Sequence, residues 1–234
     1  MELKFKNFSK KYPYEKYYLI DSLSFCIKDG DKKGILFDEQ SGKTTVAKCI
    51  AQITLPTSGQ ILLNGKPLRE IAPRERQIAI VYDDFALMNN RSFWKNVAFP
   101  LKIRKIKMPD RKNIAIDALK RFDLVSRENE KVKKKELLSS DAIKLAFARA
   151  SVRKFGLIVF DDIYKKVPST IANELIDNLL KGFTGAELYL SSNIDDFIEL
   201  DEILVMRLGE CVFKGKYCEV VDFLKASDVM NFEI

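Results

Sequence analysis

The stretch Lys33–Ile53, KGILFDEQSGKTTVAKCIAQI, decides the fold of this chain. Residues 33–37 form a short apolar run typical of a buried strand, and the residues after Gly42 have apolar positions at helical spacing. A polar loop separates the two segments and leads into Ser41-Gly42-Lys43-Thr44-Thr45. A strand, a loop and a helix that begins with Gly-Lys-Thr make up the latter half of a phosphate-binding loop.

Such a loop binds phosphate for definite physical reasons. Backbone amides at the start of a helix point at phosphate oxygens, and the helix dipole favours negative charge there. Lys43 would neutralise the phosphates, Thr44 would bind magnesium, and Ser41, Gly42 and Thr45 would complete the nucleotide-binding set. The alternative is that Lys43 is only a surface charge at the start of a helix.

Two features of the same loop oppose nucleotide binding. Phe37 stands six residues before Lys43, where the pattern has a glycine that allows the backbone to turn tightly. Asp38 and Glu39 add carboxylates beside the phosphates, and each opposes a phosphate charge by about 1 kcal/mol or more at roughly 10 Å. We therefore expect ATP and magnesium to bind poorly or not at all.

Outward from this loop, strands alternate with helices, which predicts an α/β fold with a mainly parallel sheet covered on both faces. The expected strands are 3–8, 19–27, 60–63, 78–82, 157–160, 188–190 and 203–206, and the expected helices include 169–180 and 216–224. The first strands form an antiparallel region with a hairpin at Asn64-Gly65. Residues 89–154, broken at Pro109, form a helical subdomain inserted into a core of 1–88 and 155–234.

Composition excludes several classes of protein. The chain has 234 residues, 47% of them hydrophobic and 31% charged, and no apolar run approaches the roughly 20 residues of a membrane span. The N-terminus lacks the apolar centre of a signal peptide, so we expect a cytoplasmic protein. Histidine is absent, which excludes a histidine base, metal ligand or pH switch.

The cysteines and the net charge also bear on function. Cys26, Cys49, Cys211 and Cys218 lack metal-type spacing, so we expect free, mostly buried thiols. Part of the net charge of +7 lies in the lysine cluster of residues 131–135, which is typical of a solvated face. We therefore do not expect nucleic acid as a partner.

Four later segments follow the phosphate loop in a recognisable order. They are RQIAIVYDDFALMNNRSFWKNVAFPLKIRK at 76–105, LLSSDAIKLAFARASV at 137–152, LIVFDDI at 157–163 and ELYLSSNIDDFIELDEILVMRLGECVFKG at 187–215. With these motifs, residues 1–225 resemble the ATP-binding subunit of ABC transporters, closest to the import type. The resemblance implies a P-loop NTPase core and a helical subdomain that carries the signature motif.

The resemblance also assigns roles to residues, and several catalytic positions are altered. Thr44, Asp83 and Asp161 would hold magnesium, with Asp83 in place of the family's glutamine. Asp162 takes the place of the general-base glutamate and is one methylene shorter, which holds the attacking water too far away. Ser192 replaces the switch histidine and cannot stabilise the γ-phosphate as a donor ring can.

The signature and adenine-binding positions are altered as well. The signature positions are Ser139, Ser140, Asp141 and Ala142. Asp141 would cap the amides of its own helix and repel the incoming phosphate. The segment LIVFDDI at 157–163 resembles the family's Walker B strand with its following carboxylate, and residues 165–168 keep no remnant of the motif that comes next in the family. Tyr12 is the residue expected to stack on adenine, although Tyr14 competes for that role.

The resemblance also implies partners. Phe85, Met88, Phe93 and Trp94 would line a groove for a transmembrane transporter subunit, or would only fill the core. We expect a degenerate subunit with negligible hydrolysis, bound peripherally at the inner face of the cell membrane. It would form half of a dimer with a more competent ATP-binding subunit or with itself. The alternatives are an active but slow ATPase that energises import, and a soluble regulatory pseudo-ATPase without a membrane partner.

Overall fold

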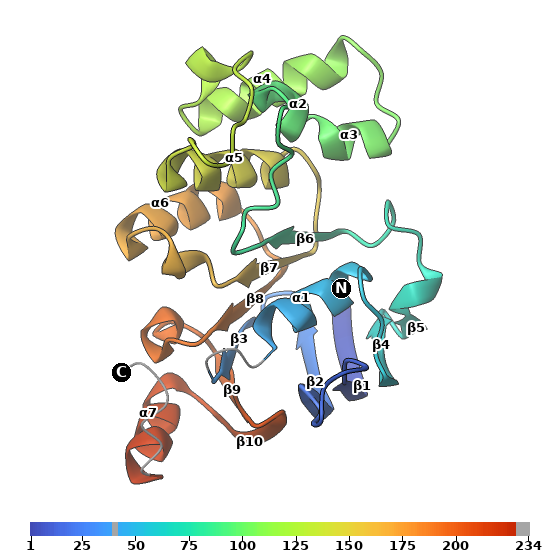
Figure 1. Cartoon of the computed structure of the whole chain (residues 1–234), viewed down its shortest axis with the longest axis vertical. Helices are drawn as coiled ribbons and strands as arrows, with labels where there is room; N and C mark the ends of the chain where they lie inside the picture. Colours follow the sequence, from blue (N-terminus) through green and yellow to red (C-terminus); the bar gives the residue numbers. More distant parts are fainter. Residues whose placement is uncertain (39–41, 228–234) are drawn as a thin grey trace. The chain divides into compact units, whose positions relative to one another are not determined.

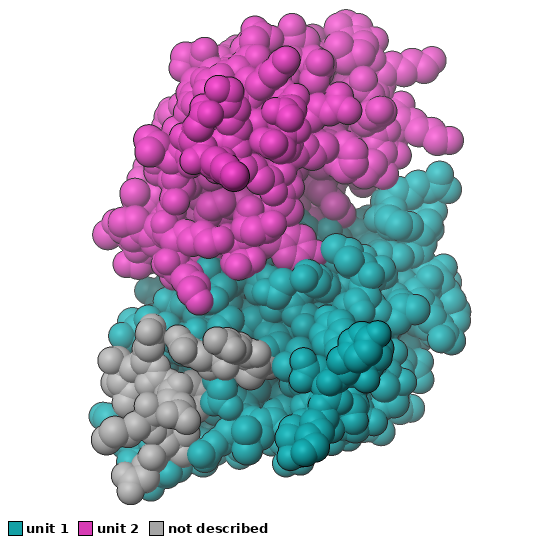
Figure 2. Space-filling model, viewed as in Figure 1, with its two compact units in different colours: residues 1–80, 156–162, 184–234 teal, residues 81–155, 163–183 magenta. Residues whose placement is uncertain are grey.

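The computed structural model describes residues 1–38 and 42–227 and separates the chain into two compact units (Figure 2). Unit 1 comprises residues 1–80, 156–162 and 184–234, and unit 2 comprises residues 81–155 and 163–183. These boundaries differ from the expected division after residues 88 and 154. The main difference is that residues 163–183, expected in the core, group with the inserted segment.

Unit 1 contains a four-stranded antiparallel sheet in the order β2-β1-β4-β5 (Figure 1). Its strands are β1 (Glu2–Lys10), β2 (Ile20–Lys28), β4 (Ser58–Leu63) and β5 (Lys66–Pro67). The rings of Phe5 and Phe25 stack in its buried face, with centroids 4.5 Å apart. Asn64 and Gly65 have φ values of 50° and 78°, which suit a two-residue hairpin turn between β4 and β5. The predicted antiparallel region is therefore confirmed.

A second sheet has the order β10-β9-β3-β8-β7-β6. Its strands are β3 (Lys32–Phe37), β6 (Ile78–Val81), β7 (Leu157–Asp161), β8 (Ala186–Ser191), β9 (Glu202–Arg207) and β10 (Glu210–Gly215). Strands β9, β3, β8 and β7 are parallel, and β10 is antiparallel to β9. Every residue of β7 and β8 is buried, as expected for a parallel sheet with both faces covered. The predicted α/β class is confirmed.

Two helices of unit 1 pack on this sheet: α1 (Lys43–Ala51) against β7, and α7 (Tyr217–Ala226) against β9 and β10. The sequence predicts that α1 reaches Ile53, but the helix ends at Ala51. It ends there because Gln52 has a left-handed φ of 61° and its backbone N–H bonds to the last carbonyls of the helix. Unit 1 also has the 3₁₀ turns η1 (Leu68–Glu70) and η4 (Ile194–Phe197).

Unit 2 is helical. Its helices are α2 (Phe93–Val97), α3 (Phe99–Ile103), α4 (Asp110–Arg121), α5 (Ser139–Ser151) and α6 (Ser169–Leu180), with 3₁₀ turns η2 (Val125–Arg127) and η3 (Ile163–Lys165). Phe93, Phe122 and Phe147 are fully buried in its core. The buried amide of Asn96 accepts a hydrogen bond from the backbone N–H of Met88 at 2.7 Å and donates to its carbonyl. These two hydrogen bonds connect the segment before α2 to the helix.

Some smaller expectations are also decided. All four cysteines are free, but Cys211 and Cys218 are exposed, so the expectation of mostly buried thiols is wrong for those two. They lie on β10 and α7, at one edge of the parallel sheet. The lysines of the segment 131–135 are exposed, as predicted. Within residues 1–38 and 42–227, no helix has the length and apolar character needed to span a membrane.

Candidate functional site

The start of α1 has the features of a phosphate-binding helix. Lys43 is its first residue, and Gly42 precedes it with a φ of 108°. Glycine adopts this conformation readily, and a Cβ at Gly42 would lie only 3.0 Å from the Ile20 side chain. Since the capping residue is a glycine, no cap side chain occupies the first amides, which can bind an anion. Ser41 and Glu39 lie outside the described residues.

The two predicted obstacles to nucleotide binding have defined places in unit 1. Phe37 is the last residue of β3, is fully buried and pairs in register with Met206 of β9, so it is a core residue. The Asp38 carboxylate accepts a hydrogen bond from the backbone N–H of Leu208 at 3.3 Å. Asp38 therefore has a backbone partner in the β9–β10 turn, which the sequence did not indicate.

Lys43 forms an ion pair with Asp162, with 3.4 Å between its Nζ and Oδ2 of the carboxylate. The two side chains are only 11% and 10% exposed. Removing one partner of a salt bridge this buried lowers the stability of the fold considerably, because the other charge is left buried and unpaired. The fold thus brings the lysine of the phosphate loop onto the carboxylate that follows the Walker B strand.

Two consecutive carboxylates end strand β7. Asp161 is its last residue and is fully buried. Asp162 follows with a φ of 51°, a left-handed conformation that aspartate tolerates, and its backbone N–H donates to the Leu190 carbonyl at 2.8 Å. This turn presents the Asp162 side chain to the start of α1.

The expected magnesium ligands are divided between the units. Thr44 and Asp161 belong to unit 1, and Asp83 belongs to unit 2. Hydroxyl and carboxylate oxygens are the ligand type that magnesium prefers, so Thr44 and Asp161 fit the ion as a partial set. The described residues contain no group of three or more His, Cys, Asp or Glu side chains placed to hold a metal. Magnesium that keeps waters and phosphate oxygens needs no such group.

The serine that contacts Asp162 is Ser191, the last residue of β8; Ser192, predicted to stand in place of the switch histidine, is the next residue. Ser191 is buried, and its Oγ lies 3.4 Å from Oδ1 of Asp162. The same hydroxyl donates a short hydrogen bond to Asp196 and accepts one from the backbone N–H of Asn193 at 3.1 Å. Ser192 is half-buried. The sequence analysis considered this segment only for the residue in place of the family's histidine, and so it gave Ser191 no role. The available signal was Asp196, a carboxylate five residues after Ser191.

Tyr12, the expected adenine-stacking residue, lies beside α1. Its hydroxyl is 3.4 Å from Oγ1 of Thr45, and Nζ of Lys10 lies 4.8 Å from its ring centroid. Tyr14 is fully exposed. Of the two tyrosines, Tyr12 is therefore the one that contacts the helix of the phosphate loop.

In unit 2, Asp83 lies beside the segment that follows the Walker B strand. Lys166 donates to the Asp83 backbone carbonyl at 2.7 Å, and its Nζ lies 4.0 Å from the carboxylate. Both side chains are more than one-third exposed. This lysine belongs to the segment 165–168, in which the sequence showed no recognisable motif.

The altered signature positions begin helix α5. Ser139 is exposed, Ser140 and Asp141 are half-buried and Ala142 is buried. Asp141 was expected to cap the amides of this helix, but it lies in the first turn, and the helix has no side-chain cap bond at its N-cap, Leu138. Its carboxylate instead accepts a hydrogen bond from Arg127 at 2.5 Å. Arg127 is thus the partner of one Asp141 oxygen, and the capping of the helix amides stays a prediction.

Two of the four expected groove residues are packed inward. Phe85 is 6% exposed and Phe93 is fully buried, whereas Met88 and Trp94 are half-buried. Lys95 and Lys112 both lie within 5.7 Å of the Trp94 ring centroid. A partner that docks on this region would therefore contact Met88 and Trp94 rather than the two phenylalanines.

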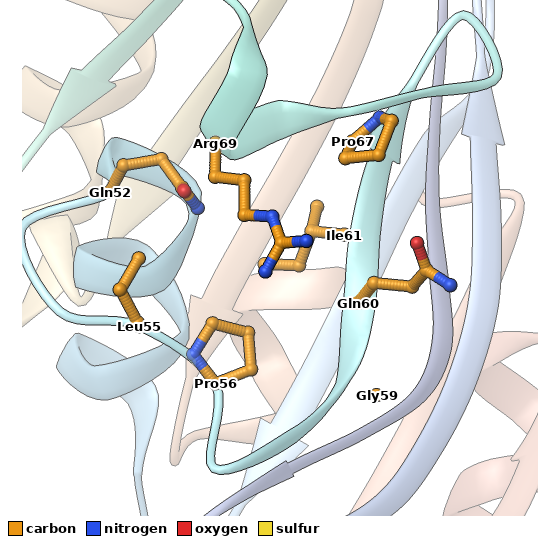
Figure 3. A pocket seen from close by; sticks show the side chains of 8 residues that line it. All are labelled: Gln52, Leu55, Pro56, Gly59, Gln60, Ile61, Pro67 and Arg69. Atoms are coloured by element: carbon orange, nitrogen blue, oxygen red, sulfur yellow. The ribbon is translucent and has the colours of Figure 1, made fainter.

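A separate surface pocket of about 250 Å³ lies in unit 1, at the opposite end of α1 from Lys43. Its lining residues are Gln52, Leu55, Pro56, Gly59, Gln60, Ile61, Pro67 and Arg69. Figure 3 shows the Arg69 side chain extending from η1 into the space between α1 and β4. The pocket is smaller than most small-molecule sites, which occupy about 300–1,000 Å³.

Comparisons with known proteins bear on this site. A family model described as "ABC transporter" matches residues 20–165. The chain is 29% identical over 231 residues to the Fe(3+) ions import ATP-binding protein FbpC of Mannheimia succiniciproducens, covering 97% of this chain and 65% of the relative. It is 26% identical to the spermidine/putrescine import ATP-binding protein PotA of Bacillus anthracis, covering 92% and 66%. The chain thus spans about two thirds or less of the length of these relatives.

Solved structures agree on the fold. A dimeric ATP-binding cassette in a post-hydrolysis state, bound to ADP and Pi, matches with a TM-score of 0.80 and 21% identity over 92% of this chain and 98% of that one. A bacterial Atm1-family ABC exporter with ATP bound matches with a TM-score of 0.77 and 18% identity, over 96% of this chain and 40% of the exporter. At such identities the likeness establishes the fold alone.

Proposed function

This chain belongs to the ABC transporter family, and we propose on that basis that it is the ATP-binding subunit of an import-type transporter. The relatives named as import ATP-binding proteins match nearly the whole of this chain, which supports the import type. The transported substrate is outside the proposal, because the family's substrate choice resides in other subunits.

The observation that carries the proposal is the placement of Lys43 against Asp162. Lys43 begins a helix whose first amides carry no cap side chain, and the Walker B carboxylates end the neighbouring strand of unit 1. A lysine, free helix amides and a carboxylate that can share a magnesium ion are what a nucleoside triphosphate needs. When bound, magnesium would neutralise phosphate charge, with Thr44 and Asp161 as its ligands from unit 1.

Slow ATP hydrolysis, with Asp162 as the general base, is the activity we propose. From the sequence alone we expect a non-hydrolysing subunit, with a slow ATPase as an alternative. The comparisons support that alternative, an active import ATPase, better. The rate should be low because Asp83, Asp162 and Ser192 stand where the family has glutamine, glutamate and histidine. Loss of one well-placed electrostatic group commonly costs about 3 kcal/mol of transition-state stabilisation.

A non-hydrolysing subunit is the second candidate, and one observation favours it. The ion pair between Lys43 and Asp162 occupies both the phosphate-binding lysine and the proposed base, at a site nearly closed to solvent. In that case the chain would be the structural or regulatory half of a dimer whose second subunit drives closure. A soluble regulatory pseudo-ATPase would share this chemistry but would need no membrane partner.

The deciding experiment measures ATP binding by calorimetry with and without magnesium, and then steady-state turnover of the same purified protein. We expect binding that requires Lys43 and slow turnover that Asp162→Asn abolishes. Binding without turnover supports the second candidate. If ATP does not bind with or without magnesium, the proposal is overturned.

We propose that the chain works at the inner face of the membrane, with a transmembrane subunit and a second ATP-binding subunit or a second copy of itself. Membership of the transporter family and the half-buried Met88 and Trp94 support this assembly. Affinity purification from the source cell, with mass spectrometry of the captured chains, tests it. Capture of neither a membrane protein nor an ATP-binding chain would contradict it and would favour the regulatory pseudo-ATPase.

A further inference from the structure

One hydroxyl in unit 1 faces two carboxylates. Ser191 Oγ lies 3.4 Å from Asp162 Oδ1 and makes a short hydrogen bond with Asp196 Oδ2. It also accepts a hydrogen bond from the backbone N–H of Asn193 at 3.1 Å. The Asn193 N–H lies two residues after Ser191 and fixes the position of the hydroxyl oxygen, whereas the O–H can rotate toward either carboxylate.

A serine hydroxyl has a single O–H group, so it can donate a full hydrogen bond to only one of the two carboxylates at a time. The Ser191 hydroxyl is placed to donate to either carboxylate, and we infer that it donates to Asp196 here, because the 3.4 Å contact with Asp162 is longer than an ordinary O–H···O hydrogen bond of about 2.5–3.0 Å. Asp162 has its cation instead, the Nζ of Lys43 at 3.4 Å.

Nucleotide binding would change that arrangement. The phosphates would draw Lys43 away from Asp162, which would then be a buried carboxylate without its cation. Asp196 is half-buried, so water can replace a hydrogen bond that it loses more easily than at Asp162. The balance therefore favours rotation of the Ser191 hydroxyl toward Asp162.

We infer that Ser191 is a positioning residue that donates a hydrogen bond to Asp196 while Lys43 is paired with Asp162, and to Asp162 once Lys43 binds phosphate. Ser191 would thereby stabilise and orient the carboxylate that we propose as the general base. The nucleotide step of this inference rests on the proposed function, whereas the exchange of hydrogen-bond partners can be tested without nucleotide.

The first test needs no nucleotide. Lys43→Met removes the cation from Asp162, as phosphate would, and thermal unfolding is compared for Ser191→Ala in the wild-type and Lys43→Met backgrounds. We expect Ser191→Ala to lower the Tm more in the Lys43→Met background, because Asp162 then depends on the hydroxyl. Ser191→Thr, which keeps the hydroxyl, should restore most of the loss. An equal fall in Tm in both backgrounds would overturn the inference.

The second test measures ADP binding by calorimetry. Ser191→Ala should weaken ADP binding by about tenfold, the effect of losing one hydrogen bond to a charged group, and Ser191→Thr should restore it. In an Asp162→Ala background the same substitution should have no effect, whereas a loss that persists there would overturn the inference. If the wild type binds neither ADP nor ATP, the proposed function fails, and the unfolding comparison still decides the role of Ser191.

Discussion

Arg127 donates a hydrogen bond to the carboxylate of Asp141 at 2.5 Å, in the first turn of α5. The same guanidinium makes two bonds of 2.6 Å to Glu130, which raises the pKa of Arg127 above its ordinary value. Asp141, which the sequence predicts to repel phosphate, therefore has its charge balanced within unit 2 by Arg127 of the 3₁₀ turn η2.

We expect Arg127→Met to lower the free energy of unfolding by about 1–2 kcal/mol, because it removes charge-assisted hydrogen bonds at a partly exposed site. Urea denaturation measures this. Glu136→Gln is the matched control: it breaks the bond with Lys133, a pair whose side chains are 63% and 68% exposed, and should cost less than about 0.5 kcal/mol. Equal costs would show that Arg127 is an ordinary surface arginine.

Arg149 holds the segment after β6 in an uncommon conformation. It donates to the carbonyls of Phe85 and Ala86 at 2.7 Å each, and both residues have positive φ, 58° and 43°. We expect Arg149→Met to destabilise the protein by about 2–3 kcal/mol, because two charge-assisted hydrogen bonds from a half-buried cation are lost. Arg149→Lys, with a compact ammonium, should lose about half as much. Unfolding midpoints within error of the wild type would contradict this role.

Glu202 links three strands through two lysines, with Lys214 Nζ at 2.8 Å and Lys33 Nζ at 3.0 Å. Burial by itself raises the pKa of Glu202, but the bonds from these lysines outweigh it and hold the pKa below its ordinary value. The ionised carboxylate therefore stabilises the fold above the unfolded pKa of about 4.3, and this stabilisation is lost as the pH falls through the lower folded value.

We expect Glu202→Gln to lower the free energy of unfolding by about 1 kcal/mol at pH 7, with the gap from the wild type closing as the pH falls below about 4. Denaturation curves at a series of pH values test this. Glu210→Gln, at an exposed position on the adjacent strand, is the control. A gap that persists at acid pH would mean that Glu202 acts through packing rather than charge.

The free cysteines should differ sharply in reactivity. Cys49 is fully buried on α1, and burial raises its pKa to about 11, whereas Cys218 is exposed. Since the thiolate is the reactive form, a maleimide at pH 7.5 should label Cys218 quickly and leave Cys49 unlabelled until the protein unfolds. Peptide mass spectrometry assigns the labelled sites, and Cys218→Ser should remove that fast site. Early labelling of Cys49 would contradict its burial.

Phe93 and its neighbour Trp94 should have separable effects. Phe93 is fully buried, so Phe93→Ala should cost about 3–5 kcal/mol of stability. Trp94 is half-buried, so Trp94→Ala should leave the fold intact and weaken only the capture of a membrane subunit. Unfolding and co-purification measure the two effects. If Trp94→Ala is as destabilising as Phe93→Ala, Trp94 is a core residue and offers no docking surface.

The local sequence was enough to predict the elements that form the phosphate loop. The apolar run that ends at Phe37, the helix that begins at Lys43 and the turn at Asn64-Gly65 are each specified by neighbouring residues, through periodicity, φ preference and turn chemistry. These patterns, with the order of the later motifs, also predicted the fold class and the family, which the structure and the family model confirm.

The charge pairing at the site depended on tertiary structure. Lys43 meets Asp162, Ser191 meets both Asp162 and Asp196, and Asp141 meets Arg127. The carboxylates could be named from the sequence, but their partners lie on a helix, a strand end and a turn that are distant in the chain or that local patterns did not single out. Propensity and periodicity depend on a few neighbouring residues. An ion pair depends instead on which residues, distant in sequence, the fold places within a few ångströms of each other.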